Sequence, residues 1–190
     1  MPKRIQPLSY QVHLNSCWTT SVSNALLVLY RDKDKIPTLA YRLLNAVLTN
    51  DGVLSTGTSG KDWRIVLEAL SIATGFSIQT FEGDQVEGAL RELHFKKQVA
   101  VCDTELGGHS ILLTGKNAKN LQGFDPDWNN VKDGSNSDHL HLYPDSEPGA
   151  QCHINFEVDL EHFAAVKQRT SLKLRMGRVP ERVMTVFERH

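Results

Sequence analysis

The chain has few cysteines and lacks any apolar run long enough to cross a membrane. Its three cysteines, Cys17, Cys102 and Cys152, are too few for a disulfide framework, and their odd number leaves at least one thiol free. We therefore expect a reducing environment. No stretch approaches the roughly 18 apolar residues of a membrane helix. The segment around Lys3 and Arg4 is not followed by an apolar core, so we expect no signal peptide and no membrane partner.

An excess of charge of one sign is also absent. Lysine and arginine number 21 against 22 aspartate and glutamate, and the formal net charge of −1 predicts no strong attraction to nucleic acid. Hydrophobic residues make up 40% of the chain and charged residues 23%, which is typical of a globular domain. There is no internal repeat or low-complexity tract. The 190 residues are enough for a single domain with its own core.

The residue pattern changes from helical to β-rich about halfway along the chain. Apolar residues at helical spacing predict helices over about 17–30, 38–48, 62–74 and 84–93, with a short helix from Asp159 toward Val166. Short branched or alternating runs predict strands over about 76–81, 98–103, 110–114, 121–124, 140–143 and 153–158. Loop composition marks 50–61 and 129–137. This order predicts an α+β domain with a helical lobe (about 15–95), a β lobe (about 96–166) and a basic C-terminal extension (about 167–190).

A cysteine lies where a predicted loop becomes a helix. Asn15 and Ser16 are both good N-cap residues for this helix, and Cys17 falls in its first turn. A thiol there sits at the positive end of the helix macrodipole, which favours thiolate over thiol. The simpler interpretation is that Cys17 is a small buried hydrophobic residue. Its position and the residues described next favour a nucleophile.

Three further residues, Gln11, His109 and Asp125, could complete a thiol-based catalytic site. A thiolate nucleophile needs a base nearby, and the base needs a third group to fix its tautomer and orientation. His109 follows two glycines at the start of a predicted strand, and Asp125 ends the next strand. If these strands are antiparallel neighbours, the imidazole and the carboxylate can form a hydrogen bond. The side-chain amide of Gln11 and the backbone N–H of Cys17 would then supply two donors to an oxyanion.

Each of these residues also has a simpler interpretation. Gln11 could be an ordinary loop residue, and His109 could be a satisfied core histidine. Asp125 could only initiate an Asp-Pro turn, in which case Asp127 is the substitute orienter. His13 lies closer to the cysteine in the sequence, but no nearby acid would orient its ring. The ordered set of residues favours His109 as the base.

A metal site is the main chemical alternative. The pairs His139-x-His141 and Cys152-His153 could supply zinc ligands from two strands. No Cys-x2-Cys spacing and no His-Glu-x-x-His helix accompanies them, so we expect exposed histidines near a loop, and no cofactor or metal.

The remaining tryptophans and the C-terminal segment have simpler assignments. Trp18 and Trp63 are expected to pack in the core, and Trp128 either shields the catalytic pair from water or packs there too. Cys102 is expected to be an inert residue of a buried strand. Basic residues, Arg182 among them, are frequent from Lys167 onward and could form a contact face for an acidic partner or nucleic acid. We favour a solvated strand–turn–helix face, because aromatic residues are not interleaved with the charges. Alternating residues over 172–176 predict an edge strand there.

The ordered motifs resemble the papain-like cysteine peptidase superfamily over roughly residues 6–130. The resemblance consists of Gln11-x5-Cys17-Trp18 entering a helix, Gly108-His109 opening a strand, and an acid ending the next strand. Two segments, Gly108-His109-Ser110-Ile111-Leu112-Leu113-Thr114-Gly115 and Phe124-Asp125-Pro126, look most like the bacterial branch. That branch includes bacteriocin-leader-processing peptidases and plant-pathogen effector proteases. Trp18 is closer to papain and the effector proteases, because leader-processing peptidases commonly have glycine after the cysteine.

The resemblance implies a papain-like two-lobed fold and a cysteine peptidase that acts on a protein or peptide. Cys17 would be the nucleophile, His109 the base and acid, Asp125 the orienter and Gln11 the oxyanion donor. It further implies a bacterial effector or toxin, cytoplasmic or delivered into a target cell by a secretion system, with an inhibitor or immunity protein as candidate partner. The same residues could deamidate glutamine or transfer an acyl group. The alternative of another class is a catalytically silent binding module.

Overall fold

The structure is a computed structural model of the chain, and it describes residues 8, 10–11, 16–30, 36–48, 60–104, 109–134, 136–143, 154–164 and 182–190. The helices are α1 (Cys17–Leu29), α2 (Thr38–Leu48), α4 (Gly60–Thr74), α5 (Gln85–Arg91), α6 (Trp128–Lys132) and α7 (Leu160–Ala164). The strands are β1 (Ser77–Glu82), β2 (Gln98–Asp103), β3 (Ser110–Asn117), β4 (Asn120–Phe124), β5 (Leu140–Leu142), β6 (Phe156–Asp159) and β7 (Val183–Glu188). The predicted α+β class is confirmed.

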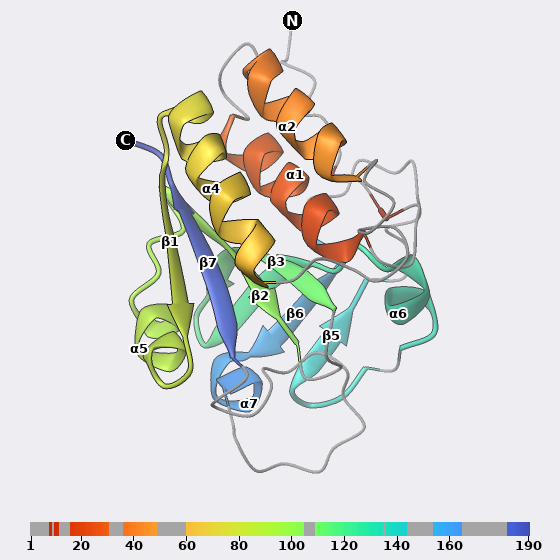
Figure 1. Cartoon of the computed structure of the whole chain (residues 1–190). Coiled ribbons are helices and arrows are strands. Elements are labelled where there is room, and N and C mark those ends of the chain that lie inside the picture. Colours follow the sequence, from red (N-terminus) through yellow and green to blue (C-terminus); the bar gives the residue numbers. More distant parts are fainter. Residues whose placement is uncertain are drawn as a thin grey trace, which may run out of the picture.

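The described strands form one sheet with helices on both of its faces (Figure 1). Its strand order is β1-β7-β2-β3-β4-β6-β5, and every neighbouring pair is antiparallel. Helices α1, α2 and α4 pack on one face through a first apolar cluster, and α5 and α7 pack on the other through a second. Trp18 lies in the first cluster, as expected of a packing residue.

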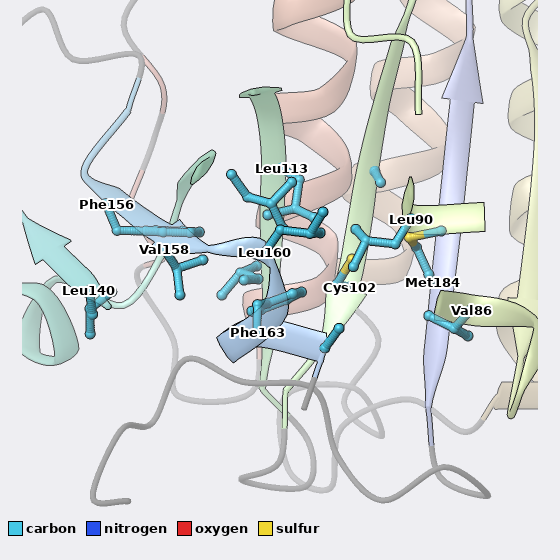
Figure 2. Close-up of a cluster of buried hydrophobic side chains, with 14 of the residues drawn as sticks. Val86, Leu90, Cys102, Leu113, Leu140, Phe156, Val158, Leu160, Phe163 and Met184 are labelled. Carbon is cyan, nitrogen blue, oxygen red and sulfur yellow. The ribbon is translucent and has the colours of Figure 1, made fainter. Parts of the chain in front are cut away.

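The central residues of β2 form a continuous apolar run because both of their sides are covered. In β2, Val99 and Val101 point toward the α1 face, whereas Ala100 and Cys102 point toward the α5 and α7 face. Figure 2 shows the second cluster, in which Cys102 lies among aliphatic and aromatic side chains. A strand that is buried on both faces has a continuous run of apolar residues and not an alternating pattern. The prediction of a buried strand around Cys102 is confirmed.

The helices of the first half begin and end within a few residues of the predicted positions. Ser16 occupies the N-cap of α1, although its side chain makes no capping hydrogen bond. Gly75 follows α4 with φ +71°, and its N–H donates to the carbonyl of Ser71 at 2.8 Å, which is the usual way in which glycine ends a helix. Within the described residues, no helix combines the length and the hydrophobicity needed to cross a membrane.

Two local predictions in the second half were wrong. The first residues of the predicted loop at 129–137 belong to helix α6. The Asp127 side chain caps this helix by accepting a hydrogen bond from the backbone N–H of Asn129. Strand β3 does not end at Gly115 but continues to Asn117, with a shift of register between Leu113 and Gly115. An irregularity in the pairing of β3 with β4 therefore replaces the expected strand end.

The end of the chain is an integral part of the sheet, not an extension from it. Strand β7 pairs with β1 on one side and β2 on the other, and its Met184 and Phe187 are buried. Arg182, counted above among the solvated basic residues, is 2% exposed and donates to the carbonyl of Ala164 at 2.7 Å. The run of branched and aromatic residues over 183–188 predicts a strand, but it lies among basic residues and was not recognised. The predicted edge strand at 172–176 lies outside the described residues.

Candidate active site

The hairpin of β3 and β4 brings His109 and Asp125 together. His109 directly precedes β3 and Asp125 directly follows β4, and the register pairs Leu112 with Phe124. The His109 Nε2 atom lies 2.8 Å from the Asp125 Oδ1 atom. The His109 side chain is 12% exposed and that of Asp125 is fully buried. The expected imidazole–carboxylate contact is therefore present.

Cys17 completes a row of three side chains. It lies at the first position of α1, which packs against β2 and β3, and it is 4% exposed. Its side chain interacts with the His109 ring through hydrogen bonding and charge, both of which raise the pKa of the imidazole. Because Nε2 of the ring faces Asp125, Nδ1 is the nitrogen that remains for the sulfur. A thiol, an imidazole and a carboxylate from three separate parts of the chain thus lie side by side in space, with the imidazole in the middle.

The electrostatics of this row favour a charged imidazole. Burial by itself lowers the pKa of His109, because it penalises the cationic ring. Hydrogen bonds to Asp125 and Cys17, together with the negative charges of both groups, outweigh that effect and raise the pKa to about 10. A ring with this pKa carries a positive charge at neutral pH.

Hydrogen bonds to neighbouring elements fix the backbone at His109 and at Ser110, which follows it. Thr104, which follows β2, donates to the His109 carbonyl from its backbone N–H at 2.9 Å and from its hydroxyl at 3.3 Å. Ser21 donates from its hydroxyl to the carbonyl of Ser110 at 3.1 Å. Because Ser21 lies one helical turn beyond Cys17, this bond ties the start of β3 to the helix that carries the thiol.

A second carboxylate, missed in the sequence, lies near the imidazole. Asp103 ends β2 opposite Ser110, whose hydroxyl donates to its Oδ1 at 2.6 Å. Burial raises the pKa of Asp103, while the hydrogen bond from Ser110 and the positive charge of His109 act in the opposite direction. The predicted strand over 98–103 ends at Asp103. If that strand had been paired with the strand that follows His109, the sequence would have placed Asp103 near the imidazole.

Gln11 lies beside the segment that follows β4. Its backbone N–H donates to the carbonyl of Pro126 at 2.8 Å, and its side-chain Oε1 is buried without a hydrogen-bond partner among the described residues. Asp127 donates from its backbone N–H to Asp125 Oδ1 at 2.8 Å and uses its own carboxylate to cap α6. Of the two acids left open by the sequence, Asp125 is the one that contacts His109.

The other candidates contribute nothing to this row within the described part of the chain. His139 stacks on His162 with ring centroids 4.7 Å apart. No group of three or more potential metal ligands is found among the residues that the structure describes. Cys152, His153 and His13 lie outside these residues, as do the side chains of Trp63 and Trp128.

Comparisons with known proteins found no matching family model, no matching curated protein and no matching solved structure. The row joins a buried thiol, an imidazole and a buried carboxylate, which are the three kinds of group that thiol-based catalysis requires.

Proposed function

We propose that the protein is a papain-like thiol hydrolase, and specifically a cysteine peptidase that cleaves a protein or peptide. The observation that carries the proposal is the row Cys17–His109–Asp125, with its raised imidazole pKa. Strongly shifted pKa values with a specific charge partner are typical of functional sites. The order of the motifs along the chain, which resembles the papain-like superfamily, supports the same assignment.

In the proposed cycle, the Cys17 thiolate attacks the carbonyl carbon of the scissile amide and forms a C–S bond. The Gln11 side-chain amide and the Cys17 backbone N–H donate to the resulting oxyanion. The His109 imidazolium then protonates the leaving amine as the C–N bond breaks. Water, deprotonated by the neutral imidazole, attacks the thioester and releases the acid and the Cys17 thiolate. The cycle uses no cofactor.

The papain-like two-lobed architecture is part of the proposal. Its support is that the cysteine begins the helix packed against the sheet, while the histidine and the acid flank the strands of one hairpin in that sheet. Substrate would bind where the start of α1 meets this hairpin. A role as an effector or toxin, with an inhibitor or immunity protein as partner, rests on the resemblance of the motifs alone.

Two other functions fit parts of the same site. A glutamine deamidase or an acyl transferase would use the same three side chains, because the cleft selects the leaving group and the acceptor. A silent binding module would need none of them. The buried thiol–imidazole–carboxylate row favours an enzyme. Burying ionisable groups costs free energy, and groups buried beside a specific charge partner are concentrated at functional sites.

Alkylation with iodoacetamide across a range of pH values, read out for each cysteine by mass spectrometry, tests the proposal. We expect rapid labelling of Cys17 below neutral pH and much slower labelling of the same residue in His109→Ala. Equal and sluggish labelling of all cysteines in both proteins would contradict an active thiol and favour the binding module. Mass spectrometry of a protein pool treated with the protein then distinguishes a peptidase from a deamidase. New chain termini indicate a peptidase, whereas glutamine converted to glutamate without cleavage indicates a deamidase.

A further inference from the structure

A single buried side chain, that of Asn155, holds the backbone of Asp125. The Asn155 Oδ1 atom accepts from the Asp125 backbone N–H at 2.7 Å, and its Nδ2 donates to the Asp125 carbonyl at 2.8 Å. Asn155 is itself fully buried. One amide thus satisfies both polar groups of the Asp125 backbone, as a neighbouring strand would, at the point where the β4 ladder ends.

The position of Asn155 is in turn fixed by its own backbone. Its N–H donates to the carbonyl of Gly123 at 2.9 Å, and its carbonyl accepts from the N–H of Tyr143 at 3.0 Å. These bonds hold Asn155 directly before β6, beside the last residues of β4. The side chain therefore reaches Asp125 from a backbone that is anchored on both sides.

The same amide reaches the N-terminal segment that carries Gln11. Asn155 Nδ2 also donates to the Tyr10 hydroxyl at 3.3 Å, and the Tyr10 ring packs against Phe124 with centroids 4.9 Å apart. The next residue, Gln11, donates from its backbone to the carbonyl of Pro126. Asn155 thus joins the segment of the orienting acid to the segment of the proposed oxyanion donor.

We infer that Asn155 is a positioning residue, which holds the Asp125 carboxylate against His109 and keeps the Gln11 segment in register with it. This inference rests on the proposed function. Asparagine suits the role because its amide offers both an acceptor and donors, whereas an aspartate of the same shape offers only acceptors. Glutamine is longer by one methylene, which a fully buried site cannot take up without moving its neighbours.

The test compares three variants with a matched control. Asn155→Ala removes all three hydrogen bonds, Asn155→Asp removes the donors, and Tyr10→Phe removes only the hydroxyl. Asn136→Ala is the control, because Asn136 likewise accepts from a backbone N–H, that of Leu142 at 2.6 Å, but outside the site. The measurements are the rate of Cys17 alkylation by iodoacetamide against pH and the melting temperature of each protein.

We expect alkylation below neutral pH to slow by about tenfold or more in Asn155→Ala and Asn155→Asp, since small displacements at a catalytic site have effects of this order. Tyr10→Phe should slow it by about threefold, in keeping with the loss of one hydrogen bond. Among the described residues, the ionisable groups that interact with His109 are Cys17, Asp125 and Asp103. All three are unchanged in every variant, but Asn155→Asp adds a carboxyl group beside Asp125, so its pH profile is compared with those of Asn155→Ala and Tyr10→Phe, which add no charge. Asn136→Ala should retain the wild-type pH profile.

The outcomes separate this inference from the proposal beneath it. If the wild type itself shows no rapid labelling that depends on His109, the proposed function fails. If the wild type is reactive but the folded Asn155→Asp and Tyr10→Phe proteins keep its pH profile, only the positioning role is overturned. If Asn155→Ala does not fold, the other two variants decide the question. A lowered melting temperature with an unchanged profile marks Asn155 as purely structural and also overturns the inference.

Discussion

The surroundings of Cys17 and Cys102 differ more than their burial does. Neither thiol forms a disulfide among the described residues, and they are 4% and 0% exposed. Cys102 lies in the apolar cluster under α5 and α7, where burial, followed by the negative charge of Asp103, raises its pKa well above the usual value. Cys17 lies on the opposite side of the sheet, at the start of a helix and in contact with His109. Polar partners, rather than burial, therefore distinguish the proposed nucleophile from the inert thiol.

The largest expected effect comes from removing each thiol in turn. Cys17→Ala should lower cleavage of a casein substrate by several orders of magnitude, because no other group in the row can form the acyl intermediate. Cys102→Ala should leave cleavage unchanged and lower the free energy of unfolding by about 1–2 kcal/mol through the small cavity left behind. Comparable loss of activity in both folded variants would contradict the distinction between the two sites.

Changing the partner of the imidazole should have the next largest effect. Asp125→Ala removes the group that orients His109, and we expect its turnover of casein to fall by about a hundredfold. Asp125→Asn retains a side-chain oxygen for the ring and should lose less. The comparison is read from kcat at saturating casein with melting temperatures as the control. Equal losses in the two variants would argue against orientation as the role of Asp125.

The charge on His109 predicts a pH-dependent difference in stability. The folded-state pKa of about 10 lies above the usual 6.5, so the charged ring stabilises the folded protein fully below pH 6.5, and this contribution is lost as the pH rises through about 10. The free energy of unfolding of wild type minus that of His109→Gln should therefore fall across this interval. Urea titrations at several pH values measure it, and a pH-independent difference would contradict the raised pKa.

A glycine near the site offers a test of its supporting strand. A Cβ at Gly123 would overlap the ring of Phe156 and lie 2.5 Å from the Leu112 carbonyl oxygen, so Gly123→Ala should destabilise the protein by about 1–3 kcal/mol. Gly88→Ala, in α5 below the other face, meets no atom within 4 Å and should stabilise it by about 0.5–1 kcal/mol. Thermal denaturation compares the two, and similar shifts would contradict the β4–β6 packing.

The smallest expected effect belongs to Asp103, whose negative charge interacts with both Cys102 and the His109 ring. Asp103→Asn removes a negative charge near His109 while keeping an acceptor for Ser110. We expect the pKa of His109 to fall and alkylation of Cys17 to slow by about two- to threefold. Ser110→Ala, which removes the hydrogen bond but keeps the carboxylate, is the control. An unchanged pH profile in Asp103→Asn would show that this charge does not act on the imidazole.

The parts of the site that sequence could predict are those set by local structure. The helix at Cys17 follows from its apolar spacing, and His109 meets Asp125 because a short hairpin joins their strands. Asn155 was missed because its contact with Asp125 depends on the pairing of β4 with β6, and residues between those strands carry no signal of that pairing. Strand β7 was missed for a related reason, since its place between β1 and β2 is set by long-range packing while its surroundings in the sequence are basic.

The charge of the His109 ring is the most direct test of the site, and an NMR titration measures it. His109→Gln identifies the ring signals among those of the other histidines. We expect the His109 ring to remain an imidazolium until about pH 10 in the wild type, and to titrate at lower pH in Cys17→Ala, where the thiolate is absent. A ring that titrates near pH 6.5 in both proteins would contradict the pairing of thiol, imidazole and carboxylate.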